Sequence, residues 1–181
     1  MQGISCANSS DCWAVGFRLT GAIPAPVATV LATTNGGRSW AREDLVPGIG
    51  ELLSISCPNT SDCWALGYTL TGLPTAGSFV VATTNGGRTW KVQMTLRRLL
   101  PQLLGISCTN TSDCWAVGSL QALQGLILAT HDGGHSWGSQ SVRNGRIGPL
   151  RSISCLAGTD ACWAVGWDGQ TNFGGEVLST R

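Results

Sequence analysis

The sequence has few charged residues. Lys, Arg, Asp and Glu together make up 12% of it, about half of the roughly 25% found in ordinary soluble domains. The formal net charge is +1, so no overall field draws the protein toward nucleic acid or anionic lipid. Low charge together with 43% hydrophobic residues argues against a disordered segment, which would need low hydrophobicity and high charge.

Long apolar runs and familiar catalytic motifs are also missing. No run approaches the ~20 residues needed to span a bilayer, so we expect no membrane span. The first residues, Met1 to Ile4, enter a repeat directly and leave no room for a signal peptide. There are only two histidines and one tyrosine, and no Gly-x-Ser-x-Gly, P-loop or His-Glu-x-x-His pattern is found. We therefore expect no metal and no cofactor.

The sequence does contain an internal repeat. Ile-Ser-Cys, a short loop and then Cys-Trp-Ala occur four times, with a period of about 50 residues. A second motif runs in phase with the first: it reads TTNGGRSW at 33–40 and recurs at 83–90 and 130–137. Two fixed motifs at such a period predict a repeat architecture.

The eight cysteines flank the short loops of the first motif. Five or six residues separate the two members of each pair, whereas zinc-binding pairs are usually two to four residues apart. Disulfides are the favoured interpretation, and buried free thiols are the alternative. The expected pairs are Cys6 with Cys12, Cys57 with Cys63, Cys108 with Cys114, and Cys155 with Cys162. Disulfides imply an extracellular or cell-envelope location. Because no signal peptide precedes the first repeat, we expect that the natural protein begins earlier.

Each repeat reads as four short strands. In the second repeat, alternating or apolar segments at 52–57, 63–68, 79–84 and 89–94 predict strands. Asn85 and Gly86 mark a tight hairpin turn, because this pair adopts the positive φ angles that such turns need. No segment has a convincing helical period. Four antiparallel strands per repeat form the blade of a β-propeller.

The predicted fold is therefore an all-β propeller in one repeat domain, 1–181. Three complete blades are expected at 1–49, 50–100 and 101–148, and an incomplete fourth at 149–181 lacks its last strand. Propellers typically have four to eight blades. We expect a partial propeller; a closed four-blade ring and a propeller shared between two chains are the alternatives. Open blade ends would favour self-association.

The second motif resembles the Asp-box of BNR-type repeats, and the whole repeat resembles sialidase-like and photosystem II stability/assembly factor-like propellers. The resemblance covers essentially the entire chain. It implies that the motif is a structural hairpin between the third and fourth strands, remote from any active site. The matching residues are Asn35, Gly37, Trp40, Asn85, Gly87, Trp90, Asp132, Gly134 and Trp137.

Seven of the eight tryptophans recur at repeat positions, which favours a packing role over a sugar-stacking platform. Trp167 lies outside the pattern and is the better ligand candidate. His131 and His135 are four residues apart, but they flank a Gly-Gly turn and are not on a helix. A shared metal is therefore disfavoured.

Catalysis by this chain is disfavoured. Glycoside hydrolysis usually needs two facing carboxyl groups, but most carboxylates here lie in turns. Sialidases also use an arginine triad and a Tyr–Glu nucleophile pair, and the only tyrosine here is Tyr68. We cannot assemble that set from this sequence.

The segments that differ between repeats are the loops after the second strand and the linkers between repeats. Binding residues tend to lie on such variable loops above a rigid scaffold. The linker side is expected to be mildly basic, and ordinary solvated charge is the alternative to a site for an acidic peptide or polyanion. The candidate ligand-binding residues are Arg42, Arg97, Arg98, Arg143, Arg146 and Trp167.

These features favour a non-catalytic binding or scaffold module of an exported protein, with a protein or glycan as ligand. A fragment of a glycan-active enzyme, sialidase-like or xyloglucanase-like, or a glycan-binding module is the alternative. No nucleic-acid partner is expected.

Overall fold

The computed structural model describes residues 1–21, 25–69, 77–97, 102–120, 124–141, 147–167 and 175–179. All regular elements in these ranges are β-strands. No helix in the described residues is long and apolar enough to serve as a transmembrane segment. The predicted all-β class is confirmed.

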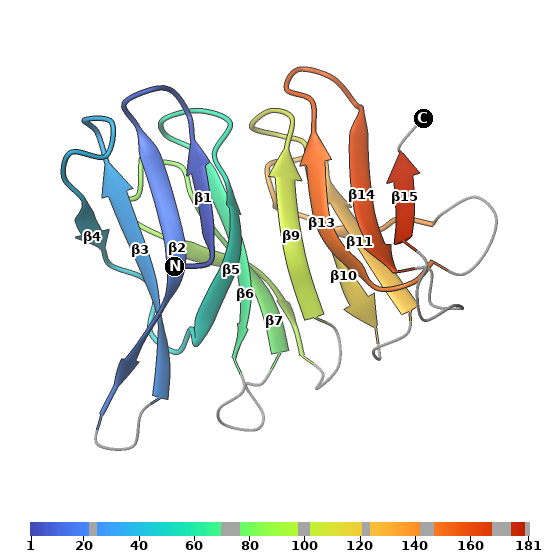
Figure 1. Ribbon diagram of the computed structural model, residues 1–181, viewed down its shortest axis with the longest axis horizontal. Coiled ribbons are helices and arrows are strands. Elements are labelled where there is room, and N and C mark those ends of the chain that lie inside the picture. Colours follow the sequence, from blue (N-terminus) through green and yellow to red (C-terminus); the bar gives the residue numbers. More distant parts are fainter. Residues whose placement is uncertain are drawn as a thin grey trace.

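Fifteen strands form four separate antiparallel sheets, each made of consecutive strands (Figure 1). The first sheet contains β1 (Gly3–Cys6), β2 (Cys12–Thr20), β3 (Ala25–Thr33) and β4 (Ala41–Glu43). The second contains β5 (Glu51–Ser56), β6 (Cys63–Thr69), β7 (Gly77–Thr83) and β8 (Lys91–Leu96). The third contains β9 (Gln102–Cys108), β10 (Cys114–Leu120), β11 (Gln124–Thr130) and β12 (Gly138–Ser139). The fourth has three described strands, β13 (Leu150–Cys155), β14 (Cys162–Trp167) and β15 (Gly175–Ser179). This is the predicted partial propeller of three complete blades and most of a fourth.

The four sheets stand side by side in chain order, with the turn between the first two strands of every blade at the same end (Figure 1). The serine of each Ile-Ser-Cys motif links neighbouring first strands. The hydroxyl oxygen of Ser5 accepts a hydrogen bond from the backbone N–H of Cys57, the first cysteine of the next blade, at 3.0 Å. Ser56 accepts the same bond from Cys108, and Ser107 accepts it from Cys155, also at 3.0 Å. The repeat motif thus specifies the junction between blades.

The core lies between the sheets, because neighbouring sheets pack face to face. Successive side chains of a strand point to opposite faces. On β6, Cys63 and Ala65 belong to the buried cluster shared with the first sheet. Trp64 and Leu66 belong to the cluster shared with the third sheet. Both faces of a central blade are therefore buried. This explains why its strands do not alternate between apolar and polar residues.

The second, third and fourth blades also need the glycine that lies two residues after Cys-Trp-Ala. In the second sheet the pairing register shifts between Leu52 and Ser54, so that Leu53 is the extra residue of a β-bulge. Gly67 lies opposite Leu52, and a Cβ on Gly67 would collide with the backbone carbonyl oxygen of Glu51. Gly118 and Gly166 occupy the same position against the carbonyl oxygens of Gln102 and Pro149. In these three blades the bulge shapes the end that leads into the variable loops.

Candidate functional site

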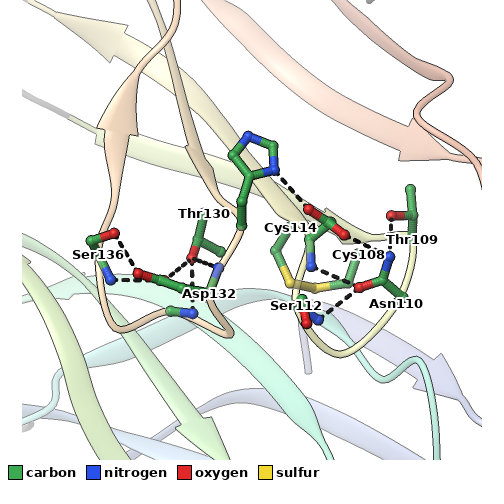
Figure 2. Close-up of polar contacts among 11 residues, drawn as sticks. Cys108, Thr109, Asn110, Ser112, Cys114, Thr130, Asp132 and Ser136 are labelled. Carbon is green, nitrogen blue, oxygen red and sulfur yellow. Dashed lines mark hydrogen bonds and ion pairs between the residues drawn. A yellow bond between two sulfur atoms is a disulfide. The ribbon is translucent and has the colours of Figure 1, made fainter.

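The end of the molecule opposite the variable loops carries the turn between the first and second strand of each blade. In the third blade, the Asn110 side-chain oxygen accepts hydrogen bonds from the backbone N–H groups of Ser112 and Asp113, at 2.7 and 2.9 Å. The Asn110 amide donates to Asp113 at 2.7 Å, and the Cys108–Cys114 disulfide closes the turn (Figure 2). Asn8 with Asp11, and Asn59 with Asp62, repeat these contacts. These aspartates therefore stabilise turns.

The structure contains all four disulfides that the sequence predicts, each between the first and second strand of one blade. They join Cys6 to Cys12, Cys57 to Cys63, Cys108 to Cys114, and Cys155 to Cys162.

The turns between the third and fourth strands, at 33–40, 83–90 and 130–137, are called the Gly-Gly turns below. In the third blade, the Thr130 hydroxyl oxygen accepts from the backbone N–H of Gly134 at 2.8 Å. Asp132 accepts from both the hydroxyl and the backbone N–H of Ser136 (Figure 2). Together with a hydrogen bond from Thr130, these bonds hold the pKa of Asp132 well below its usual range. Asn35 and Asn85 accept the equivalent backbone bonds at 3.0 Å.

The two kinds of turn are bonded to each other within each blade. The backbone N–H of Gly133 donates to the carbonyl of Ser112, and Gly36 and Gly86 make the same bond to Ser10 and Ser61. In the third blade alone, His131 adds a side-chain contact to Asp113 at 2.6 Å. This pair was not predicted from the sequence. The signal for it was the pairing of Cys114 with Thr130 on neighbouring strands, which places residues 113 and 131 side by side.

A carboxylate joins the first and second blades near the Gly-Gly turns. Glu43 accepts a hydrogen bond from the indole of Trp13 at 3.0 Å and another from the indole of Trp90, in the next blade, at 2.8 Å. Gly87 lies directly against this carboxylate: it has a φ of 86°, and a Cβ there would overlap the Glu43 oxygens. Burial raises the pKa of Glu43 above its ordinary value of 4.5, although the two indole hydrogen bonds act in the opposite direction.

The second and third blades are joined by an amide at the equivalent position. Gln93 accepts from the indole of Trp64 at 2.9 Å and donates to the carbonyl of Gly133 at 2.9 Å. The buried indole N–H of Trp137, the counterpart of Trp90, has no hydrogen-bond partner among the described residues. An amide offers one acceptor oxygen, whereas a carboxylate offers two. For this reason Gln93 accepts from one indole, whereas Glu43 accepts from two.

The Glu43→Gln variant tests this bridge through the pH dependence of stability. Because the folded state raises the pKa of Glu43, it binds a proton in a pH range where the unfolded chain has already lost it. The stability from this group is therefore fully present below pH 4.5 and is lost as pH rises through the folded-state pKa. We expect the wild type to gain stability relative to E43Q as pH is lowered from 7 to 4, as measured by urea unfolding.

Asp44, the exposed carboxylate next to Glu43 in the sequence, provides the control for that experiment. Asp44→Asn removes one negative charge next to the bridge without touching either indole. If D44N and E43Q changed the pH dependence equally, general charge would be responsible and not the bridge.

The predicted ligand-binding residues do not all lie at the loop end. Arg42 pairs with Leu31, only two residues before the end of β3, so it lies beside the first Gly-Gly turn. The expected grouping of Arg42 with the linkers is therefore wrong, because the fourth strand starts at the turn end. Arg97 follows Leu96, which pairs with Ser78 at the loop end, and is exposed there. Arg98, Arg143 and Arg146 lie outside the described residues.

Trp167 lies at the loop end of the fourth blade and is mostly exposed. The guanidinium carbon of Arg151 lies over its ring, 5.3 Å from the ring centroid. Arg151 is the extra residue of a bulge, because Leu150 pairs with Gly166 and Ser152 pairs with Val165. Leucines, Leu53 and Leu104, occupy the matching bulges of the second and third blades. The fourth blade thus presents a cation and an aromatic ring together.

Trp167 also corrects one expectation from the sequence, which placed it outside the repeat pattern. It follows Cys162 by the same interval that separates Phe17 from Cys12 and Tyr68 from Cys63. Trp167 is the last paired residue of its second strand, Tyr68 is the last but one, and in the first blade the pairing continues beyond Phe17 to Thr20. The position is a repeat position, and only its partner Arg151 is peculiar to the fourth blade.

A pocket of about 400 Å³ lies between the second and third blades, at the turn end. Its lining includes Lys91 and His135, which face no carboxylate among the lining residues. The imidazole Nδ1 of His135 lies 2.6 Å from the backbone carbonyl of Asp132. The described residues contain no group of three or more side chains of the kinds that hold a metal ion.

No protein-family model and no curated protein matches the sequence. Solved structures match it through the fold. A structure of YCF48 bound to D1 peptide superposes with a TM-score of 0.60 at 19% identity, covering 97% of this chain and 54% of that one. A nidogen/laminin complex superposes with a TM-score of 0.63 at 10% identity, covering 98% of this chain and 64% of that one.

A NanB sialidase from Streptococcus pneumoniae has a TM-score of 0.58 at 13% identity, over 84% of this chain and 26% of the sialidase chain. At these identities the likenesses show the fold alone. This chain therefore has a β-propeller fold and spans between a quarter and two thirds of the length of these chains.

Proposed function

We propose that this chain is a non-catalytic binding module that holds a peptide segment of a partner protein at its loop end. The observation that carries the proposal is the pairing of Arg151 with the exposed ring of Trp167. Arginine and tryptophan are the side chains most enriched among residues that dominate protein interfaces. Arg97 adds a second exposed cation at the same end of a blade.

The hydrogen bonds made by the carboxylates support a non-catalytic role. Asp11, Asp62 and Asp113 are bonded within their own turns, and Asp132 is bonded within a Gly-Gly turn. Glu43 bridges two indoles. A glycosidase needs two carboxyl groups that are free to face a sugar, whereas these five have structural partners.

The comparisons are compatible with this proposal. One structural neighbour is a propeller in complex with a peptide, and another is a sialidase. The sialidase is the reason to keep a glycan-active or glycan-binding module as the alternative. The four disulfides favour an exported module, because disulfides persist in oxidising compartments.

Fluorescence anisotropy with a short fluorescein-labelled peptide rich in glutamate tests the proposal. We expect saturable binding that weakens about tenfold or more in Arg151→Glu, since a charge reversal at a contact repels an acidic ligand. Trp167→Ala should weaken binding as well, through loss of the ring.

The matched control is Arg88→Glu, which reverses the same charge on an exposed residue of a Gly-Gly turn, at the opposite end. Equal weakening by R88E and R151E would show non-specific charge attraction and contradict the assigned site. Hydrolysis of any member of a panel of methylumbelliferyl glycosides would overturn the non-catalytic proposal and favour the glycan-active alternative.

A further inference from the structure

The pocket between the second and third blades has one wall from each blade. Lys91 and Gln93 of β8 belong to one wall, and Gly134 and His135 of the third Gly-Gly turn form the other. Gln93 donates to the carbonyl of Gly133 at 2.9 Å, so the two walls are bonded to each other. The first and fourth blades pack against the other faces of these blades, which holds both walls in place. The volume of about 400 Å³ lies within the range of small-molecule sites, roughly 300–1,000 Å³.

The pocket carries positive charge, and none of the described residues that line it is acidic. Lys91 is exposed, and its ammonium group forms no ion pair with any described carboxylate. At the junction between the first and second blades, Glu43 occupies the position that Gln93 has here, since each accepts from a second-strand indole. A carboxylate at this position would repel an anion, whereas the amide of Gln93 is neutral. The second junction is therefore the one suited to an anionic ligand.

The hydrogen bond made by His135 determines which of its ring nitrogens can meet a ligand. Nδ1 lies 2.6 Å from the backbone carbonyl oxygen of Asp132. A carbonyl can only accept, so Nδ1 carries a proton and Nε2 is the nitrogen left for a ligand. In the neutral ring Nε2 has no proton and cannot donate to an anion, whereas in the imidazolium ion it can. Anion binding is therefore expected to strengthen as pH falls.

Two charged groups lie near this ring, Lys91 on the opposite wall and Asp132 in the same turn. Hydrogen bonds from Ser136 and Thr130 hold the pKa of Asp132 well below its usual range, so this carboxylate stays ionised between pH 5.5 and pH 8. The imidazole is the kind of side chain that changes its charge in that interval. A change of anion binding across it therefore reports the His135 ring.

We propose that this pocket binds a small polar ligand through a sulfate or phosphate group, held by the Lys91 ammonium group and the protonated His135 ring. Lysine binds such groups as a point charge. The rest of the ligand lies against Asn85 and Thr89, which line the same pocket. The Asn85 amide donates to the Thr89 hydroxyl oxygen at 2.9 Å, so the Thr89 hydroxyl can donate its own proton to the ligand. This site is at the turn end and is separate from the peptide site proposed at the loop end.

An NMR titration of the full chain with sodium sulfate, exchanged for sodium chloride at constant ionic strength, tests the site. Sulfate keeps its charge from pH 5.5 to pH 8, and the chain has only two histidines, so each imidazole can be followed separately. We expect saturable shifts of the His135 ring, whereas His131, which contacts Asp113, should not respond. Binding should be about tenfold tighter at pH 5.5 than at pH 8. Lys91→Met should weaken it about tenfold or more, as expected when a hydrogen bond to a charged group is lost.

Arg88→Met is the matched control for the loss of a cation. Arg88 holds the position of His135 at the first junction, where Gly87 lies against the carboxylate of Glu43. R88M should leave sulfate binding unchanged. Equal weakening by R88M and K91M would show general attraction by charge and overturn the site. His135→Gln should abolish the difference between the two pH values while circular dichroism shows an unchanged fold, and a difference that persists would contradict the role of the ring.

Glucose 6-sulfate and glucose separate a free ion from a group carried by a larger molecule. Glucose 6-sulfate should bind about threefold or more tightly than inorganic sulfate, the gain expected from a further hydrogen bond. Glucose alone should not shift the His135 signals. Equal affinity for inorganic sulfate and glucose 6-sulfate would show an adventitious ion only, and absence of saturable sulfate binding at pH 5.5 would overturn the proposal.

Discussion

Trp90→Ala is expected to lower the free energy of unfolding by about 3–5 kcal/mol, the usual range for truncating a buried aromatic side chain. Trp90 is 3% exposed and belongs to the cluster between the first and second blades. Its indole also donates to Glu43, so truncation removes a hydrogen bond from a partly buried carboxylate. Urea unfolding followed by circular dichroism measures the loss.

The same motif in the first blade provides a matched control for Trp90. Trp40 follows an equivalent Gly-Gly turn, but it is 39% exposed, because none of the described residues forms a blade against that side. Trp40→Ala should cost about 1 kcal/mol or less, as for most surface substitutions. Similar losses for W90A and W40A would show that the turn, and not the junction between blades, determines the contribution of the tryptophan.

Reduction of the four disulfides is expected to unfold the chain or to leave it barely folded. Each disulfide closes a loop between cysteines six or seven residues apart. In the chain-entropy model such a loop contributes roughly 2 kcal/mol. The loops do not overlap along the sequence, so their contributions add to about 8 kcal/mol. That sum is comparable with the whole stability of an ordinary domain, about 5–15 kcal/mol.

Urea unfolding with and without a phosphine reductant measures this effect, and iodoacetamide labelling counts the thiols that are released. The double variant Cys57→Ser, Cys63→Ser is the intermediate case and should lose only about 2 kcal/mol. A fully reduced chain with the urea midpoint of the oxidised protein would contradict the expected stabilisation.

The fold and the disulfides could be predicted from the sequence because they follow from short-range patterns that recur. Cys6 and Cys12 flank one turn, and their partners in the other blades repeat that spacing. Asn85 and Gly86 signal a hairpin by their own backbone preferences. Both signals, the cysteine spacing and the Asn-Gly pair, depend on residues close in the sequence. Their repetition in several blades distinguishes them from chance occurrences.

The contacts between blades could not be predicted in the same way. Glu43 meets Trp90, which lies 47 residues away, only because two sheets pack with one particular register. Arg42 was misplaced because the start of the fourth strand depends on where the Gly-Gly turn ends. Arg151 meets Trp167 because a bulge inserts one residue into β13, and no local pattern marks that insertion.

The serine bonds between first strands have a consequence for how such a chain evolves. At each of the three junctions, the earlier repeat supplies the acceptor and the later repeat supplies the donor. Duplicating or deleting a whole repeat therefore leaves every remaining junction with both of its partners. The number of blades can change in a single genetic step, without compensating substitutions, while a cut inside a repeat separates a donor from its acceptor.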